Sequence, residues 1–365
     1  MNIIVSAGGT GGHIYPALAI INKFKEKEKN LNVLYIGTHN RMEKEIVPNM
    51  SIPYEEIEIY GFSKKQIIRD FKNIILIRKA IKKCIKIMED FKPDVVIGVG
   101  GYVTMPVLYA AKKLNIPIVI HEQNSIPGKT NKLLSSFSDL VCTSYDNSNM
   151  YFKKAKKVIY TGNPCGENAL TTNRITKESL GLHKSKKLIL FVSGSLGSQT
   201  INDFATKFLS LFEDNDNFEI LYITGNAYYD DFIKDKTFSK NVKILPFLNN
   251  MSGLFRDVDL IISRAGAGTI SEILALEIPS ILIPSPYVAN NHQYYNALDL
   301  KEKKVSIMVQ EKELNAKKVY DKVKDLLSDS KEYREMKNNL KKLDMKNASS
   351  IIYTEIKEIL KWLKL

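Results

Sequence analysis

The stretch MNIIVSAGGTGGHIYPALAI, Met1 to Ile20, joins a short apolar run to a glycine-rich turn and then to a helical pattern. Residues 2–7 (NIIVSA) have the uncharged, β-branched composition of a buried strand, and residues 16–29 have the pattern of a helix. The turn lacks side chains at four positions: Gly8, Gly9, Gly11 and Gly12. Free N–H groups at a helix start attract anions, so this unit predicts a parallel strand whose end binds a large anionic ligand.

The same order of strand, turn and helix recurs along the whole chain. Further candidate strands lie at residues 31–38, 94–100, 116–123, 139–144, 157–162, 187–194, 218–225, 242–247, 258–266 and 279–286. Most are continuous apolar runs, as expected of parallel strands covered by helices on both faces. Because residues 190–198 (LFVSGSLGS) restart the pattern of the N-terminus, we predict an α/β fold with two doubly wound, Rossmann-like domains.

The boundary between the domains is expected near Gly162-Asn163-Pro164. Residues 1–163 then form an N-terminal domain and residues 164–345 a C-terminal domain, because 365 residues exceed one ordinary core. Doubly wound sheets bind ligands at the carboxyl ends of their strands, so we expect the domains to face one another across a cleft. Residues 346–365 read as a helix with no strand after it, and we expect this helix to pack back on the N-terminal domain.

The composition is that of a soluble protein of a reducing compartment, with 44% hydrophobic and 25% charged residues. The three cysteines form no CxxC pair, no basic region of a signal peptide precedes the first strand, and no apolar run reaches the roughly 20 residues of a membrane span. The net charge of +13 indicates an anionic partner, a nucleic acid or a membrane, unless it only reflects a lysine-rich genome composition.

The first glycine turn fits neither common nucleotide motif. In the dinucleotide fingerprint GxGxxG the third glycine position holds Ile14, and the strand at residues 31–38 is not followed by an acidic residue. No lysine follows the glycines, which excludes a Walker motif. A purely structural turn remains the alternative, although four glycines exceed what helix–strand packing requires.

A better nucleotide site lies at residues 262–272 (ISRAGAGTISE). The helix start after the strand can hold a diphosphate, and Glu272 one turn later can bind two ribose hydroxyls or, alternatively, cap the helix. Ser195, at another strand end, can add a hydroxyl to the same phosphates. Asp214 with Asp216 and Asp257 with Asp259 match a metal-binding pair only formally, because one pair lies in a polar turn and the other begins a strand. We therefore predict no metal site.

Several motifs occur in the order typical of one family. They are residues 8–19 (GGTGGHIYPALA), 98–106 (GVGGYVTMP), 121–132 (HEQNSIPGKTNK), 162–164 (GNP), 193–202 (SGSLGSQTIN), 263–272 (SRAGAGTISE) and 290–297 (NNHQYYNA). Together they resemble the MurG family of N-acetylglucosaminyltransferases. The resemblance implies the GT-B architecture and inverting transfer of N-acetylglucosamine from UDP-N-acetylglucosamine to undecaprenyl-diphosphoryl-N-acetylmuramoyl-pentapeptide. It also implies UDP as second product, no cofactor, and a role in peptidoglycan synthesis, cell shape and division.

The resemblance also assigns residues to the two substrates. Donor contacts fall on Thr10, Gly11, Gly12, Asn124, Ser195, Leu248, Gly266, Ala267, Gly268, Thr269, Ile270, Ser271, Glu272 and Gln293, with Leu248 meeting uracil through its backbone. Arg264 is a further donor candidate, as a cation near the diphosphate. Acceptor contacts fall on Gly8, Gly9, Gly100, Gly101 and Tyr102. One departure is that Cys165-Gly166 follow GNP, where the family commonly has a small residue and then an arginine near the diphosphate. Either Arg264 compensates, or the helix dipole and Ser195 suffice.

Two residues are candidates for the base that deprotonates the attacking hydroxyl. His13 lies in the first helical turn and can accept a proton near neutral pH, although it can equally be a cap or a phosphate donor. Glu122, between His121 and Gln123 at a strand end, is the other candidate. Both fall in the acceptor half, and the sequence does not choose between them.

The basic stretch from Gly61 to Met88 accounts for part of the net charge. Apolar residues between lysines suit an interfacial helix on anionic lipid, and the exposed tip is expected to include Ile67, Ile68, Phe71, Ile74 and Ile75. Ile77, Ala80, Ile81, Cys84 and Ile85 instead form a buried stripe. We expect a peripheral protein on the cytoplasmic side of the membrane, in contact with cell-wall synthesis or division proteins, and no binding of nucleic acid.

Three other functions compete with this one. Sugar-nucleotide 2-epimerases share the architecture and the donor but need no lipid surface, and a binding protein would not need His13 and Glu122. A glycolipid synthase acting on diacylglycerol is the nearest transferase, against which residues 121–132 argue.

Overall fold

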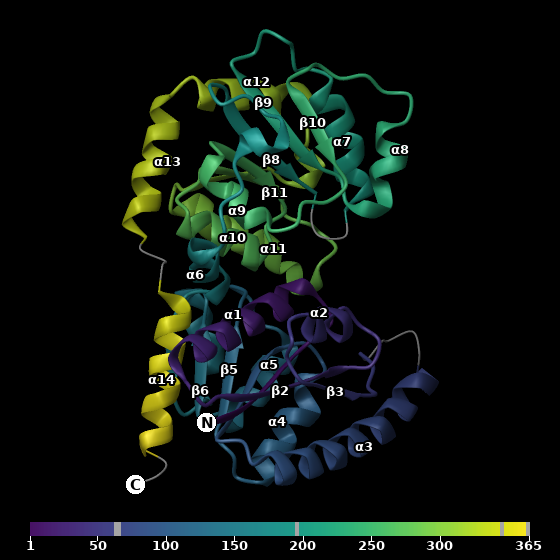
Figure 1. Ribbon diagram of the computed structural model, residues 1–365, viewed down its shortest axis with the longest axis vertical. Helices are drawn as coiled ribbons and strands as arrows, with labels where there is room; N and C mark the ends of the chain where they lie inside the picture. Colours follow the sequence, from purple (N-terminus) through teal and green to yellow (C-terminus); the bar gives the residue numbers. More distant parts are fainter. Residues whose placement is uncertain (62–66, 194–196, 344–346, 363–365) are drawn as a thin grey trace. The chain divides into compact units, whose positions relative to one another are not determined.

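The computed structural model describes residues 1–61, 67–193, 197–343 and 347–362, and it leaves out the side chains of residues 67–71. The chain divides into two compact units, Met1–Glu167 with Asn347–Leu365, and Asn168–Lys346 (Figure 1). The chain passes from the first unit to the second after Glu167, a few residues beyond the expected boundary at 163. Among the described residues, no helix is both long and apolar enough to span a bilayer.

The first unit contains a seven-stranded parallel sheet of order β3-β2-β1-β4-β5-β6-β7. Its strands are β1 (Asn2–Ala7), β2 (Asn32–Thr38), β3 (Tyr54–Ile57), β4 (Val95–Gly100), β5 (Ile118–Glu122), β6 (Leu140–Thr143) and β7 (Val158–Tyr160). The strand order reverses between β1 and β4, and the carboxyl ends of such a pair are where doubly wound sheets bind ligands. The glycine turn after β1 therefore lies at this switch point.

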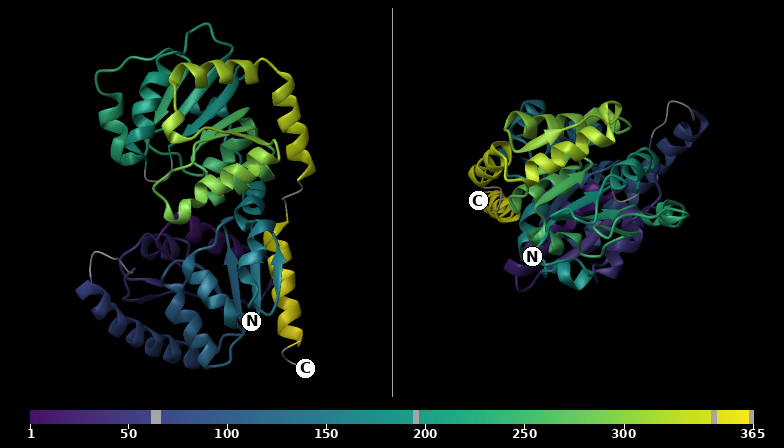
Figure 2. Two further views of the ribbon diagram at one scale, coloured as in Figure 1. Left: turned by 180° about the vertical axis from the view of Figure 1, so that it is seen from behind. Right: turned by 90° about the horizontal axis from the view of Figure 1, so that it is seen from above.

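Helices cover both faces of this sheet because successive strand residues point to opposite sides. Ile3 and Val5 pack with α1 (Gly11–Lys27), α2 (Glu43–Asn49) and α14 (Ala348–Trp362), whereas Ile4 packs with α3 (Ile67–Phe91) and α4 (Thr104–Lys113). The shorter helices are α5 (Lys129–Leu134), η1 (Ser135–Phe137), η2 (Asp146–Phe152) and α6 (Pro164–Thr171). The C-terminal helix α14 lies against α1. Figure 2 shows α14 from behind, in yellow.

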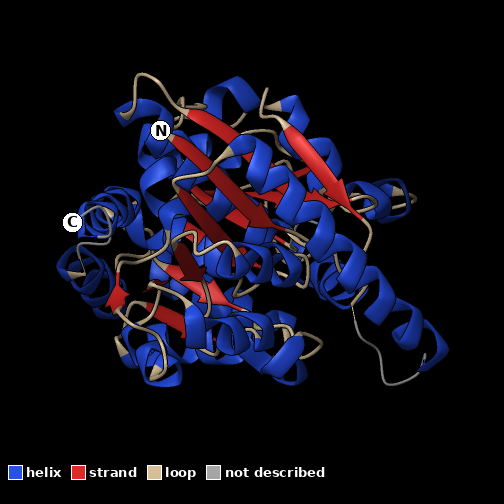
Figure 3. Cartoon of the chain, turned by 90° about the horizontal axis from the view of Figure 1, so that it is seen from below, coloured by secondary structure: helices blue, strands red, loops and turns tan. Residues whose placement is uncertain are grey.

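The second unit contains a six-stranded parallel sheet of order β10-β9-β8-β11-β12-β13. The strands are β8 (Lys187–Val192), β9 (Phe218–Ile223), β10 (Val242–Leu245), β11 (Leu260–Ser263), β12 (Ser280–Leu282) and β13 (Ser306–Met308). Here the order reverses between β8 and β11, so the turns after these two strands form the second switch point. Figure 3 shows the strands of both units in red, surrounded by helices.

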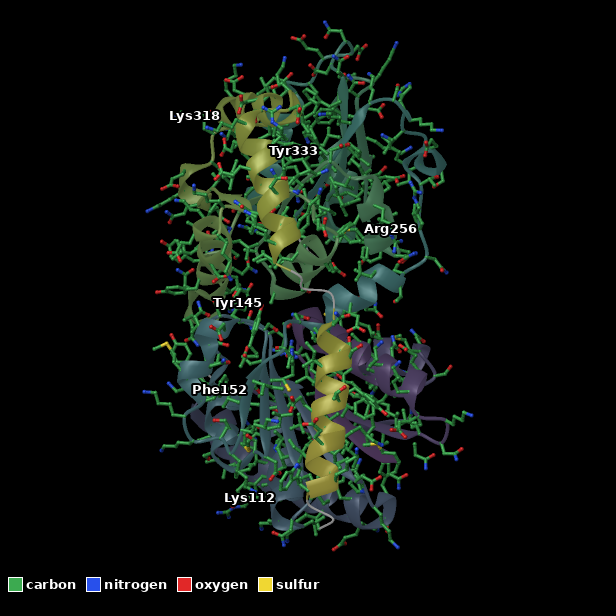
Figure 4. All side chains as sticks on the ribbon, turned by 90° about the vertical axis from the view of Figure 1, so that its left-hand side faces the viewer. Lys112, Tyr145, Phe152, Arg256, Lys318 and Tyr333 are labelled. Atoms are coloured by element: carbon green, nitrogen blue, oxygen red, sulfur yellow. The ribbon has the colours of Figure 1, made fainter. Side chains whose placement is uncertain are left out.

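The helices of this unit are η3 (Lys177–Leu180), α7 (Gln199–Leu209), η4 (Asn226–Tyr228), α8 (Tyr229–Ile233), α9 (Met251–Leu254), η5 (Phe255–Asp257), α10 (Ala267–Ala275), η6 (Ala289–Asn291), α11 (His292–Glu302), η7 (Glu311–Glu313), α12 (Ala316–Leu327) and α13 (Lys331–Lys342). An aromatic core on one face of the sheet is enclosed by α7, α8, α12 and α13. Phe191, Phe208 and Tyr222 fill that core. Tyr333 of α13, labelled in Figure 4, has a hydroxyl that donates to the Asp259 carbonyl at 3.0 Å.

Candidate functional site

The turns after β1 and β4 interlock at the first switch point. The Gly8 N–H donates to the Gly100 carbonyl at 3.2 Å, and a Cβ on Gly101 would lie 2.4 Å from the Gly8 oxygen. Gly101 has a φ of +88°, which side chains rarely adopt. Only glycine lets the two turns approach this closely, so part of the glycine motif has an internal structural reason.

The remaining glycines of the first turn leave the backbone open. A Cβ on Gly9 would meet no atom within 4 Å, and Thr10 and Gly12 are exposed. The Thr10 side chain does not cap α1, so the helix begins with N–H groups that the helix itself cannot satisfy. This arrangement fits an anionic ligand at the N–H groups of Gly11 and Gly12, whereas the Gly8 and Gly9 N–H groups donate within the protein, to Gly100 and Glu43.

His13 lies at this turn in a form that can accept a proton. Its Nδ1 lies 3.1 Å from the Gly8 carbonyl oxygen, and since a carbonyl only accepts, Nδ1 carries the hydrogen and Nε2 carries the lone pair. Burial lowers the pKa of His13 below its usual value, and the Gly8 carbonyl and the Glu43 charge offset only part of this. The ring is therefore neutral at pH 7 and packs directly on Gly100, where a Cβ would lie 2.6 Å from Cδ2.

Glu122 has a different environment. Its buried carboxylate accepts from the N–H and the side-chain amide of Asn124 at 3.0 and 3.2 Å, from the Gly128 N–H at 3.0 Å and from Asn131 Nδ2 at 2.9 Å. Burial raises the pKa of Glu122, while these four hydrogen bonds favour the charged form. The carboxylate thus fixes the loop of residues 123–131, including Asn124, and its lone pairs are already used.

His121 and Gln123 serve the same loop from inside. His121 Nε2 lies 3.2 Å from the Gly162 carbonyl and Gln123 Nε2 donates to His121 Nδ1 at 2.9 Å. Burial lowers the pKa of His121 to about 4, so the ring is neutral and structural.

Tyr102, a predicted acceptor contact, is partly buried, and its hydroxyl accepts from Arg41 Nε at 3.4 Å.

The second switch point presents the start of α10. Gly266 precedes the helix in an extended conformation, its Cβ position is open, and no side chain caps the first turn. Gly268 and Thr269 are partly exposed, whereas Ala267, Ile270 and Ser271 are buried. Any ligand contact of these three residues must therefore come mainly from the backbone, which suits a phosphate at a helix N-terminus.

Glu272 follows one turn later and is held by α9. Its Oε1 accepts from the Ser252 hydroxyl at 2.8 Å, and Ser252 follows the segment that contains Leu248. Burial raises the pKa of Glu272 to about 7. On α11, Gln293 Oε1 accepts from the Ser285 N–H at 2.9 Å, so its oxygen is already used by the protein.

Arg264 is not the free cation that its motif suggested. Its guanidinium forms an ion pair of 2.5 Å with Glu311, and both side chains are about nine-tenths buried. It also donates to the Ser198 hydroxyl at 3.0 Å and to the Ile283 carbonyl at 3.4 Å. The Arg264 side chain therefore links the loop after β11 to η7 and to the start of α7. Ser195 lies outside the described residues.

Cys165 and Gly166 stand in the first turn of α6, and both are buried. The Cys165 N–H donates to Asn163 Oδ1 at 3.1 Å, so Asn163 caps this helix. Neither residue supplies the positive charge that an arginine would bring there. In the two aspartate pairs, Asp214 accepts from the Ser239 hydroxyl and the Lys240 N–H, and Asp257 binds Arg174 and the Lys177 N–H.

The surface of the first unit carries exposed apolar side chains among lysines. Ile74 and Ile75 of α3 are exposed, while Ile77, Ala80 and Cys84 are buried; the side chains of Ile67, Ile68 and Phe71 lie outside the described residues.

A second exposed set lies on neighbouring elements of the same unit: Tyr109, Leu133 and Met150, with Lys112, Lys113 and Lys132 placed over aromatic rings. Sequence reasoning missed this set, and its only signal was an apolar Leu133 within the polar run KTNKLLSS.

Comparison with known proteins places these features in a family. Residues 3–143 match the glycosyltransferase family 28 N-terminal domain, and residues 188–352 match its C-terminal domain. A protein of Halalkalibacterium halodurans named UDP-N-acetylglucosamine--N-acetylmuramyl-(pentapeptide) pyrophosphoryl-undecaprenol N-acetylglucosamine transferase is 43% identical over 367 residues, covering 99% of this chain and all of its own. A protein of Caldanaerobacter subterraneus with the same name is 43% identical, covering 98% of this chain and all of its own.

Solved structures give the same result. The crystal structure of MurG from Acinetobacter baumannii has a TM-score of 0.75 at 27% identity, and the match covers 98% of this chain and 99% of that one. A UDP-GlcNAc 2-epimerase from Neisseria meningitidis shares the fold alone, with a TM-score of 0.67 at 17% identity over 98% of this chain and all of that one. The predicted GT-B architecture of two Rossmann-like domains is thereby confirmed. The chain belongs to glycosyltransferase family 28 and, within it, to the MurG family.

Proposed function

We propose that this chain transfers N-acetylglucosamine from UDP-N-acetylglucosamine to undecaprenyl-diphosphoryl-N-acetylmuramoyl-pentapeptide, with inversion at the sugar carbon. The named relatives act on these substrates, and they match essentially the whole chain. The observation that carries the proposal is that each unit has an open glycine turn at its switch point. The first turn holds a neutral His13 with Nε2 available, and the second leads into α10 and Glu272.

The second unit supplies the main donor site. The start of α10, at Gly266 to Ser271, holds the diphosphate; Glu272 binds the ribose hydroxyls; and Leu248 meets the uracil through its backbone. Gln293 binds the sugar hydroxyls through its amide nitrogen, since its oxygen is held by Ser285. Thr10, Gly11, Gly12 and Asn124 of the first unit complete the donor contacts, and Gly9 and Tyr102 contribute to the acceptor site.

We assign the role of base to His13. It removes the proton of the attacking hydroxyl at Nε2, while the four hydrogen bonds of Glu122 support a positioning role for that carboxylate. The leaving diphosphate is stabilised by the helix N-terminus and its backbone N–H groups, because Arg264 is paired with Glu311. We propose that no metal ion takes part, because the backbone N–H groups at the start of α10 can stabilise the leaving diphosphate.

We also propose a peripheral location on the cytoplasmic face of the membrane. Ile74 and Ile75, and the second set around Leu133, combine exposed apolar side chains with lysines, as interfacial proteins do. A lipid-linked acceptor requires access to that surface, and cell-wall synthesis or division proteins work there.

The test is release of UDP from UDP-N-acetylglucosamine in EDTA, with and without a short-chain analogue of the lipid-linked acceptor. Acceptor-dependent release supports metal-independent transfer. Formation of a 2-epimer without acceptor would instead assign the chain to the epimerases that share its fold. Tight UDP binding without turnover would contradict the proposed acceptor.

A further inference from the structure

Glu43, the first residue of α2, is a buried carboxylate that none of the roles above uses. Its Oε1 accepts from the Thr38 hydroxyl at 2.6 Å and from the Thr38 N–H at 3.2 Å. Its Oε2 accepts from the Gly9 N–H at 3.1 Å. Burying a carboxylate costs free energy unless such donors satisfy it. An apolar side chain would fill the same space without this cost, so packing alone does not explain a glutamate here.

The strand ends around Glu43 are shaped to admit it. A Cβ on Gly8 would lie 2.3 Å from Oε1, and a Cβ on Gly37 would lie 2.8 Å from the Glu43 Cγ. A Cβ on Gly37 would also lie 2.4 Å from the Tyr54 hydroxyl oxygen, so Gly37 leaves space for Tyr54 and the Glu43 side chain, and Gly8 leaves space for the carboxyl group itself. This explains why Gly8, which leaves no opening to a ligand, has no side chain.

A single peptide group connects Glu43 to His13. The N–H of Gly9 is held by Glu43, and the carbonyl of Gly8, at the other end of the same peptide bond, accepts from His13 Nδ1. Because a peptide group is planar, fixing its N–H also fixes the direction of its carbonyl. Hydrogen bonds in such a chain polarise one another, so the carboxylate strengthens the bond that orients the imidazole.

We propose that Glu43 is a positioning residue for the transfer reaction, acting on His13 through the Gly8–Gly9 peptide. This rests on the proposed role of His13 as base. The attacking oxygen bonds to the sugar carbon, its proton passes to His13 Nε2, and the bond from carbon to the diphosphate oxygen breaks with its electron pair leaving on UDP. The Glu43 carboxylate, through this peptide, stabilises the imidazolium that forms.

The other ionisable groups around Glu43 do not replace its charge. Burial and the Glu43 charge raise the pKa of the Tyr35 and Tyr54 phenols well above their usual value, so both are neutral at pH 7. Arg41 lies on the same loop, is exposed, and donates to Tyr102 instead. Glu43 is thus the carboxylate whose charge reaches His13.

The test compares Glu43→Gln with Glu45→Gln, an exposed glutamate on the same helix. We expect Glu43→Gln to lower kcat about 10- to 100-fold, less than the roughly 10²- to 10⁴-fold loss of a general base, with UDP affinity unchanged. Loss of the negative charge lowers the His13 pKa, so the acidic limb of the kcat profile moves to lower pH. ¹⁵N NMR of labelled histidine, assigned with His13→Ala, measures the same pKa and the Nδ1–H tautomer directly. Glu45→Gln should change neither.

Two further variants make the outcome decisive. Glu43→Asp keeps the charge and should hold the His13 pKa nearer to that of the natural protein. Thr38→Val removes one hydrogen-bond donor to Glu43 and serves if Glu43→Gln does not fold. It should shift kcat and the His13 pKa in the same direction as expected for Glu43→Gln. An unchanged His13 pKa and tautomer in Glu43→Gln would overturn the proposal, even if kcat fell. If the natural protein shows no transfer at all, the proposed function fails, while the NMR comparison still tests the link.

Discussion

At the scale of single residues, the two candidate bases have opposite environments. His13 presents an unprotonated Nε2, whereas all lone pairs of Glu122 that face the protein accept hydrogen bonds. We expect His13→Ala to lower kcat roughly 10²- to 10⁴-fold with little change in stability. Glu122→Gln places an amide against donors, so it should lower the free energy of unfolding by about 2 kcal/mol. Kinetics and urea unfolding of both variants measure this, and a reversed pattern would make Glu122 the base.

The Glu272 pKa of about 7, raised by burial, predicts a pH-dependent affinity for UDP. A carboxylate accepts two ribose hydroxyls and a protonated carboxyl does not, so the affinity should rise as pH increases from 6 to 8. Titration calorimetry with UDP measures it. Glu272→Gln should retain only the dependence that comes from the terminal phosphate of UDP, while Glu302→Gln, an exposed control on α11, should match the natural protein. An equal slope in Glu272→Gln would exclude this role.

At the scale of elements, Arg264 joins β11 to η7 and α7 through a buried ion pair with Glu311. Removing one partner leaves the other charge buried, so Glu311→Ala should lower the free energy of unfolding by about 3 kcal/mol. The double variant Arg264→Met with Glu311→Leu should recover most of that loss. Urea unfolding followed by circular dichroism checks both. If the double variant is stable but loses UDP binding, Arg264 contacts the diphosphate after all.

The sequence could predict those elements whose formation depends on residues close together in the chain, and not the contacts between residues far apart in it. The strand–turn–helix order and the motif at residues 263–272 are local patterns, and both are confirmed as β1 with α1 and as β11 with α10. The partners of Arg264 and Gly8 were not predictable, because Glu311 and Glu43 are brought to them only by the fold. The four donors of Glu122 lie within nine residues, but they reach the carboxylate only through the conformation of residues 123–131, which follows no helix or strand periodicity.

At the scale of the whole molecule, the net charge of +13 indicates an anionic partner, but composition alone does not locate the surface that binds it. The first unit offers a candidate surface for this partner, since its exposed apolar side chains lie among lysines. We expect Ile75→Glu and Leu133→Glu to weaken sedimentation with vesicles containing anionic lipid, because each places a charge at the interface. Added salt should weaken binding of the natural protein as well.

The matched control for these variants is Ile233→Glu, an exposed isoleucine of the second unit. It should bind vesicles like the natural protein. If all three variants bind equally, the lysines alone carry the attraction or the contact surface lies elsewhere.

The position of α14 has a consequence for the order in which the protein matures on the ribosome. Ile352 and Ile356 belong to the core of the first unit, although the whole second unit is translated before them. The second unit is one continuous segment and can complete its fold as soon as it emerges, whereas the earlier-made unit waits for the last residues. A nascent chain that stops before residue 347 leaves part of an apolar face beside α1 uncovered. Premature termination near the 3′ end of the message should therefore yield a product that chaperones and proteases recognise, although its second unit is intact.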